Sequence, residues 1–298
     1  MNVLSLFDGI SCGYLALERA GIHVDNYIAS EIDKHAINIS KKHYPQIIRF
    51  GDVREIKGSD ISKICNIDLM IGGSPCQSFS RSGDNSGFDG KSGLVYEYIR
   101  LLNEVNPKYF LLENVVMKNE WRDYISKCLG VNPVMIDSSY FSAQKRQRYY
   151  WTNIPLDVSR IEDKKINLKD ILTSCDRKCI SDNPVVINKN NGVLHIRNAT
   201  KKGYLIANDG DAVNLEVPNS NTRRGRVSSG KTNTLNTACN YGVVINGELY
   251  ELNITEYERL QTLPDGYTDG ISCSQRKKVI GNGWTVDVVS FIFQGLNK

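Results

Sequence analysis

Short apolar runs alternate with amphipathic helical patterns over residues 1–150. Short apolar runs bounded by glycine or acidic residues are typical of strands buried in a parallel sheet, and apolar positions at helical spacing predict helices between them. The predicted strands cover residues 3–6, 27–30, 47–50, 68–71, 109–112 and 134–136, and the predicted helices cover residues 14–20, 33–43, 94–105 and 120–129. We therefore predict an α/β fold with a doubly wound, mostly parallel sheet.

The pattern changes after Asn153. The segment from Asp176 to Lys231 is rich in Asn, Thr, Ser and Gly, its basic residues outnumber its acidic residues, and its strand-like runs are short. Helical patterns return at residues 255–262 and 284–294. We expect residues 1–154 and 251–298 to form the main domain, and residues 155–250 to form a smaller, loop-rich β lobe inserted into it.

Composition limits the class of protein. A chain of 298 residues with 41% hydrophobic and 23% charged residues can bury a core and is not a disordered polymer. The net charge of +4 permits a polyanionic partner without requiring one. No apolar run reaches the roughly 18 residues of a membrane span, and the apolar start of the chain ends at Asp8 without the basic region of a secretory signal.

The eight cysteines are scattered through the chain, which favours a reducing, cytoplasmic setting over a disulfide scaffold. Cys175 and Cys179 lie close in sequence, but no second close pair follows them, so we expect no zinc or other metal site.

The ends of the first three predicted strands carry groups that suit a nucleoside. The first strand runs into Phe7-Asp8-Gly9-Ile10-Ser11-Cys12-Gly13, where glycines let a ligand approach the backbone. Glu31 could bind ribose hydroxyls, and Asp52 could accept a hydrogen bond from an adenine amino group. The turn lacks the full Gly-x-Gly-x-x-Gly of dinucleotide sites, so a cofactor with ribose and base but no pyrophosphate fits better. Taken singly, each feature also fits an ordinary turn or a solvated loop.

Two further strand ends carry reactive groups. The fourth strand ends in Gly72-Gly73-Ser74-Pro75-Cys76-Gln77, and small polar neighbours suit a nucleophilic Cys76, although a cysteine in a loop can be inert. The Gly-rich residues 81–93 then predict a lid. Glu113 directly follows the next apolar run, where a partly desolvated carboxyl group can hold a proton near neutral pH. Arg146 and Arg148 alternate along an expected strand and would share one face.

Together these segments resemble the motifs of the DNA cytosine-5 methyltransferase family, in the family's usual order. The similar segments are the Phe7–Gly13 turn, Ser74-Pro75-Cys76-Gln77, Glu113-Asn114-Val115, Gln144-Lys145-Arg146-Gln147-Arg148, residues 255–264 and Gly281-Asn282-Gly283-Trp284. Phe7-Asp8-Gly9-Ile10 and Trp284 also resemble the catalytic domain of the animal de novo branch. Asn282 departs from that branch, which tends to carry Arg there, and the chain has no room for chromatin-reading domains.

The resemblance implies a Rossmann-like fold of the S-adenosylmethionine-dependent methyltransferase type, with S-adenosyl-L-methionine as cofactor and double-stranded DNA as partner. It implies catalysis by Cys76, Glu113, Arg146 and Arg148 on a cytosine flipped out of the duplex. The residues implied in cofactor binding are Phe7, Asp8, Gly9, Cys12, Gly13, Glu31, Ile32, Asp52, Val53, Pro75, Asn282, Gly283 and Trp284. Expected DNA contacts come from Gln77, Ser80 and Arg81 in the lid and from the basic residues Arg223, Arg224, Arg226 and Lys231 in the lobe.

We expect a monomeric bacterial or phage modification enzyme whose lobe selects the target sequence. Two alternatives stay open. One branch of the family methylates transfer RNA, which would keep the chemistry and change the substrate. A catalytically silent module that only binds DNA would use the same fold, although intact Cys76, Glu113 and Arg148 argue against it.

Overall fold

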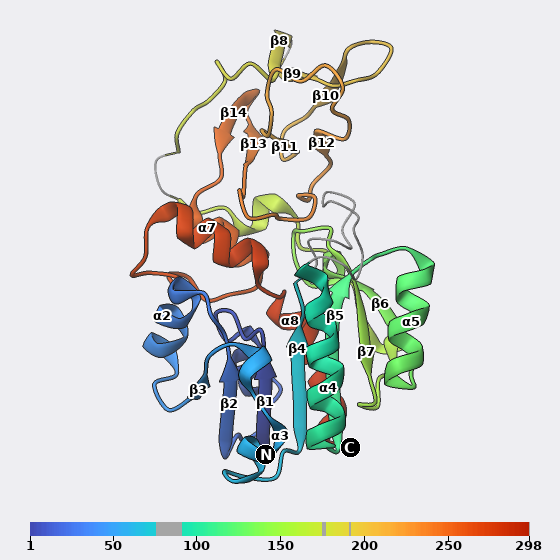
Figure 1. Cartoon of the computed structure of the whole chain (residues 1–298). Coiled ribbons are helices and arrows are strands. Elements are labelled where there is room, and N and C mark those ends of the chain that lie inside the picture. Colours follow the sequence, from blue (N-terminus) through green and yellow to red (C-terminus); the bar gives the residue numbers. More distant parts are fainter. Residues whose placement is uncertain (76–90, 175–176, 191, 298) are drawn as a thin grey trace. The chain divides into compact units, whose positions relative to one another are not determined.

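The computed structural model describes residues 1–75, 91–174, 177–190 and 192–297. The chain divides into two compact units. The first consists of Met1–Asp137, Gln147–Arg160 and Val286–Lys298, and the second consists of Ser138–Arg146 and Ile161–Thr285. Each unit has its own sheets and helices (Figure 1).

Within the described residues, the first unit is built on a seven-stranded sheet of order β3-β2-β1-β4-β5-β7-β6. Neighbouring strands from β3 to β5 are parallel, whereas β7 runs antiparallel to both β5 and β6. The predicted doubly wound, mostly parallel sheet is therefore confirmed. The strands are β1 (Asn2–Leu6), β2 (Asn26–Ser30), β3 (Ile48–Phe50), β4 (Leu69–Gly73), β5 (Tyr109–Val115), β6 (Val134–Asp137) and β7 (Gln147–Thr152).

Helices cover the sheet because its strands are apolar on both faces. Leu4 of β1 and Leu112 of β5 belong to one buried cluster with Tyr98 of α4 and Trp121 of α5. Figure 1 shows α4 in front of the sheet and α8 behind it, and an ion pair of 2.7 Å joins Arg19 of α1 to Asp287 of α8. The helices of this unit are α1 (Cys12–Arg19), α2 (Lys34–His43), α3 (Gly58–Ser62), α4 (Val95–Val105), α5 (Asn119–Leu129) and α8 (Val286–Phe293).

The second unit contains two small antiparallel sheets and two helices among its described residues. The sheet orders are β10-β9-β8 and β12-β11-β13-β14, and Leu194, Ile196, Val213, Val244 and Leu249 pack between them in a shared core. The elements are β8 (Val186–Asn190), β9 (Val193–Arg197), β10 (Tyr204–Ala207), β11 (Ala212–Asn214), β12 (Val227–Ser228), β13 (Tyr241–Ile245), β14 (Glu248–Glu251), α6 (Ile254–Leu260) and α7 (Cys273–Asn282).

The compact units divide the chain differently from the predicted domains. Residues 251–285, expected in the main domain, pack in the second unit together with Ser138–Arg146. Contacts of α6 explain this packing, because the fully buried Glu256 pairs with Arg177 and the carbonyl oxygen of Leu260 accepts a hydrogen bond of 2.6 Å from Ser142 Oγ. The division of labour between a catalytic domain and a recognition lobe stays a prediction.

Helix α7 was not predicted from the sequence. Most of its side chains are polar, and its buried positions, Val279, Ile280 and Gly281, are confined to its last turn. A Cβ atom on Gly281 would lie 2.1 Å from the Asn236 carbonyl oxygen, so only glycine allows the helix to approach that backbone. None of the helices in the described part of the chain has the length and apolar character that crossing a membrane requires.

We expect Gly281→Ala to destabilise the protein by about 1–3 kcal/mol, because the new methyl group must push the 236–237 backbone away from α7. Urea unfolding measures the change. Gly51→Ala is the control, since nothing lies within 4 Å of a Cβ atom built there. Its effect should stay within about 0.5 kcal/mol, and an equal loss in both variants would contradict this account of the α7 contact.

Candidate functional site

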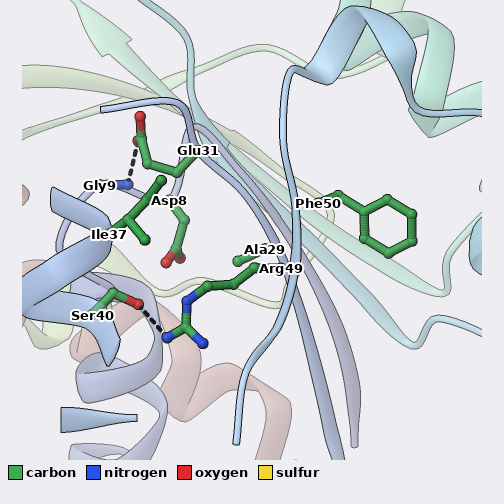
Figure 2. Close-up of a pocket in the computed structure, with 8 residues that line it drawn as sticks. All are labelled: Asp8, Gly9, Ala29, Glu31, Ile37, Ser40, Arg49 and Phe50. Atoms are coloured by element: carbon green, nitrogen blue, oxygen red, sulfur yellow. Dashed lines mark hydrogen bonds between the residues drawn. The ribbon is translucent and has the colours of Figure 1, made fainter. Parts of the chain in front are cut away.

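Glu31 lies just beyond the end of β2 and is oriented by backbone donors. Its Oε1 accepts hydrogen bonds from the N–H groups of Ile32 (2.7 Å) and Asp33 (2.8 Å), and its Oε2 accepts one from Gly9 (2.8 Å; Figure 2). A carboxylate has about four lone-pair sites, so one site remains, on Oε2. The side chain can therefore accept one ribose hydroxyl directly without losing its present support.

A pocket of the first unit lies beside this carboxylate. Figure 2 shows Asp8, in the turn after β1, and Arg49 of β3 facing the pocket, whereas the ring of Phe50 points away from them. Sequence reasoning missed Ile37, Ser40, Arg49 and Phe50, because short strands and helices do not reveal which side chains will face one another. The lining residues are Asp8, Gly9, Ala29, Glu31, Ile37, Ser40, Arg49 and Phe50.

The other expected cofactor residues of the first unit differ in accessibility. Ile32 is 68% exposed beside Glu31, which suits contact with a flat base. Asp52 pairs with Arg54, and the side-chain hydrogen bond from Arg54 lowers the pKa of Asp52 to about 2, so this group is an acceptor at neutral pH. Val53 is buried in the core, so its backbone alone could reach a ligand.

The glycine-containing turn leads directly into α1. Phe7, at the start of the turn, has a left-handed backbone with φ of 56°. Cys12 and Gly13, expected to contact the cofactor, are buried in the first turn of the helix.

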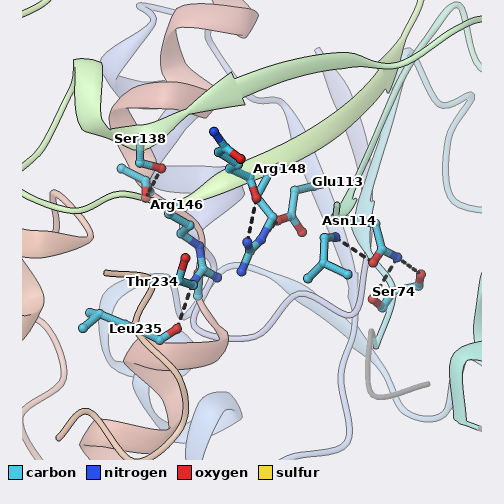
Figure 3. Close-up of polar contacts among 12 residues, drawn as sticks. Ser74, Glu113, Asn114, Ser138, Arg146, Arg148, Thr234 and Leu235 are labelled. Carbon is cyan, nitrogen blue, oxygen red and sulfur yellow. Dashed lines mark hydrogen bonds and ion pairs between the residues drawn. The ribbon is translucent and has the colours of Figure 1, made fainter. Parts of the chain in front are cut away.

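The end of β4 is fixed to β5 just before Cys76. Gly73 pairs with Glu113 in the sheet, and the buried Asn114 donates a hydrogen bond of 3.0 Å from Nδ2 to Ser74 Oγ (Figure 3). This contact holds the chain at Ser74, next to Pro75. Cys76, Gln77, Ser80 and Arg81 lie outside the described residues, so their expected roles stay predictions.

Glu113 of β5 and Arg148 of β7 form an ion pair on the same edge. Arg148 Nε lies 3.0 Å from Glu113 Oε1, and the two side chains are 12% and 10% exposed (Figure 3). Arg148 pairs with Val115 in the antiparallel register, two residues beyond Glu113, so both side chains project from one face. The sequence named both residues, and the structure brings them together.

The expectation that Arg146 and Arg148 share one face of a strand is wrong, because β7 begins only at Gln147. Arg146 is buried in the second unit, where its guanidinium donates to the carbonyl oxygens of Leu235 (3.1 Å), Gly281 (3.3 Å) and Gly283 (3.0 Å). Its contacts fix the chain around the last motif. In that motif Asn282 is exposed, and Gly283 and Trp284 are partly buried.

The four basic residues expected to contact DNA also differ. Arg226 is fully buried and donates to the carbonyl oxygens of Asn214, Glu216 and Val217, and Lys231 donates to three other carbonyl oxygens. This placement does not support DNA contacts by Arg226 or Lys231, because the terminal nitrogens of both side chains already donate to backbone oxygens inside the unit. Arg223 pairs with Glu216 and is partly buried, and Arg224 is exposed.

The first unit thus places Glu31 beyond the end of β2, and the Glu113–Arg148 pair at the end of β5, on the edge of the sheet where the parallel strands have their carboxyl ends. In open α/β sheets, ligands bind at this edge. Glu31 keeps one acceptor site for a ribose hydroxyl at this edge, which together with the fold suits a nucleoside cofactor such as S-adenosylmethionine.

Comparisons with known proteins agree with this arrangement. The chain is 32% identical over 219 residues to the type II methyltransferase M.NgoPII of Neisseria gonorrhoeae, an alignment that covers 64% of this chain and 63% of that protein. It is 32% identical over 188 residues to the orphan methyltransferase M.SPRI of Bacillus phage SPR, which covers 58% of this chain and 42% of that protein. The alignments therefore span less than two thirds of these relatives.

The fold matches that of the S. pombe Dnmt2 methyltransferase with a TM-score of 0.68 and 16% identity, covering 100% of both chains. The family model described as C-5 cytosine-specific DNA methylase matches residues 1–298. The predicted family is thereby confirmed, with S-adenosylmethionine as the implied methyl donor, whereas the likeness to the animal de novo branch stays a prediction. The chain belongs to the C-5 cytosine-specific DNA methylase family.

Proposed function

We propose that this protein transfers a methyl group from S-adenosylmethionine to carbon 5 of a cytosine in duplex DNA. The observation that carries the proposal is the Glu113–Arg148 pair, because it lies beside the strand that leads to Cys76 and offers complementary groups to one pyrimidine edge. Glu31, Ile32 and Asp52 would hold the nucleoside part of the cofactor.

Cys76 makes carbon 5 reactive. Its thiolate adds to carbon 6, which forms a sulfur–carbon bond and turns carbon 5 into a nucleophile. A free thiol with a pKa of about 8.5 is only a few per cent ionised at neutral pH, so the site must favour the thiolate. S-adenosylmethionine, when bound, supplies an electrophilic methyl group to carbon 5. Loss of the carbon 5 proton to a base then expels Cys76 and restores the aromatic ring.

Glu113 and Arg148 act on the polar edge of the ring. Glu113 hydrogen-bonds the ring nitrogen and amino group and supplies a proton as negative charge builds up in the ring. Arg148 donates to the ring carbonyl oxygen. Because the two side chains already pair at 3.0 Å, they are oriented before substrate arrives and little ordering is needed on binding.

Flipping the target base out of the duplex costs a few kcal/mol, which phosphate contacts can offset. Such contacts can come from a group of basic residues in the second unit, here called the basic ridge, made of Arg197, Lys201, Lys202, Arg223 and Arg224. Ala199 N–H donates to the Arg223 carbonyl oxygen (2.9 Å), and Arg197 Nη1 donates to Asn221 Oδ1 (3.2 Å), so the β9–β10 turn and the 221–224 segment lie side by side. This ridge extends the predicted Arg223–Arg224 contact to the exposed Lys201 and Lys202.

The named relatives favour a bacterial or phage modification enzyme. The two alternatives, transfer RNA as substrate and a silent DNA-binding module, are separated from the proposal by comparing methyl incorporation into duplex DNA and transfer RNA. Bisulfite sequencing of DNA from expressing cells would also give the recognised sequence.

Cys76→Ser should abolish methyl transfer while leaving the Kd for S-adenosylmethionine within about twofold, because only the nucleophile is lost. A radiolabelled methyl assay and calorimetry measure the two effects. The wild type should also form a covalent adduct with duplex DNA containing 5-fluorocytosine, and the variant should not. Near-normal transfer by the variant would show that another residue is the nucleophile.

Glu113→Gln should lower the single-turnover rate by about 100-fold or more, while the Kd for duplex DNA changes little, because the lost proton donor acts mainly in the transition state. Fluorescence anisotropy gives the Kd. Glu120→Gln, on the exposed surface of α5, is the control and should change neither quantity. Equal losses of rate and affinity in Glu113→Gln would assign Glu113 a structural role instead.

The variant Lys201→Gln/Lys202→Gln/Arg224→Gln should weaken DNA binding and reduce the slope of log affinity against log salt by about 2–3, since each lost phosphate contact removes about 0.9. The matched control, Lys41→Gln/Lys108→Gln/Lys127→Gln, removes the same charge from exposed positions of the first unit. If both variants reduce the slope equally, the effect comes from net charge and the ridge is not a binding surface.

A further inference from the structure

The turn between β1 and α1 is strained. Phe7, Gly9 and Ser11 have φ values of 56°, 58° and 59°, and Ser11 is also the residue at which α1 begins. Glycine adopts this left-handed region freely, whereas each of the two side-chain-bearing residues costs about 1 kcal/mol or more. A turn of this shape persists only if surrounding contacts hold it.

The Asp8 carboxylate, in the middle of this turn, supplies such contacts. Its Oδ1 accepts hydrogen bonds from Ser5 Oγ (2.7 Å) and the Tyr27 hydroxyl (2.8 Å), and its Oδ2 accepts one from Ser11 Oγ (2.5 Å). These donors come from β1, from β2 and from the start of α1. One side chain therefore ties both ends of the turn to the neighbouring strand.

The network continues to β3. Ser11 Oγ lies 2.7 Å from Ser40 Oγ, and Arg49 Nη2 donates to Ser40 Oγ at 2.9 Å (Figure 2). Ser40 therefore lies between the Arg49 guanidinium and Ser11, and these contacts connect β3 to the start of α1 and to the Asp8 carboxylate.

Stability alone does not account for a carboxylate at this position. Burial raises the pKa of Asp8 above its usual value, and the three hydroxyl donors only partly oppose the rise. A carboxyl group with a raised pKa in the fold costs stability once the pH exceeds its usual pKa, because the ionised form is the disfavoured one. An asparagine of the same shape avoids that cost.

One hydrogen bond connects the conformation of this turn to Glu31, the proposed ribose-binding carboxylate. Gly9 N–H donates to Glu31 Oε2 at 2.8 Å, on the oxygen that keeps a free lone pair. Resting on the proposed function, we propose that Asp8 is a positioning residue for cofactor binding, which holds the Phe7–Ser11 turn so that Gly9 orients Glu31 towards a ribose hydroxyl. Asp8 then acts on the nucleoside half of S-adenosylmethionine through Glu31 and not by its own contact.

Equilibrium binding to the full chain, without DNA, tests this assignment. Asp8→Asn should weaken S-adenosylmethionine and adenosine by a similar factor, about tenfold, and leave 2′,3′-dideoxyadenosine unchanged, because only ligands with ribose hydroxyls use Glu31. A loss for S-adenosylmethionine without a loss for adenosine would mean that Asp8 contacts the methionine half directly and would overturn the proposal. An unchanged affinity for S-adenosylmethionine would do the same.

Variants of the residues that contact Asp8 distinguish a specific effect on the position of Glu31 from general destabilisation of the protein. Tyr27→Phe and Ser5→Ala each remove one donor to Asp8 and should produce smaller losses with the same ligand pattern. Ser126→Ala is the control, because it removes a partly buried hydroxyl that accepts from Trp151 Nε1 (2.9 Å) elsewhere in the same unit, and it should leave all three affinities unchanged. An equal loss in that control would overturn the proposal.

Adding Ser11→Gly to Asp8→Ala gives a rescue test. If Asp8 acts by holding the left-handed turn, glycine at position 11 removes part of the strain. The double variant should then bind S-adenosylmethionine at least threefold more tightly than Asp8→Ala alone. No recovery would overturn the mechanism through the turn. The outcome does not depend on methyl transfer, so failure of this proposal and failure of the proposed function remain distinguishable.

Discussion

The pairing of parallel strands is the constraint on which the candidate site depends. Parallel strands end at the same edge, so residues far apart in the sequence meet without any loop having to bring them together. The β4–β5 register sets Gly73 against Glu113, and the antiparallel β7 returns Arg148 to that edge. A slip of one residue in either pairing would turn Glu113 or Arg148 to the opposite face and separate the pair.

Charged side chains in this protein have two structural roles. Glu113 and Arg148 pair with each other, largely buried, and keep polar atoms at the site. Arg146, Arg226 and Lys231 are instead occupied by backbone carbonyl oxygens, which fixes loops that no regular element holds. Local sequence does not distinguish the two, because an arginine near glycines can serve a phosphate or a carbonyl equally well.

The sequence predicted the central strands and most helices of the first unit closely, because their apolar runs are buried on both faces. It also named Glu31 and Glu113, since each follows an apolar run directly, and Arg148, which lies on an expected strand within a family motif. It did not predict α7, whose buried residues lie only in its last turn, or the placement of Arg146 before β7. The hydroxyl contacts of Asp8 join residues from separate elements and leave no periodic signal.

Arg226 is fully buried among the carbonyl oxygens of residues 214–217 and serves as an internal brace for its loop. Because these internal hydrogen bonds fix the backbone, the side chains at neighbouring surface positions can change without altering the backbone conformation. Exchange of the outward-facing residues would therefore leave the scaffold intact. Replacing Arg226 itself would instead leave several carbonyl groups without donors, and the loop would lose its shape.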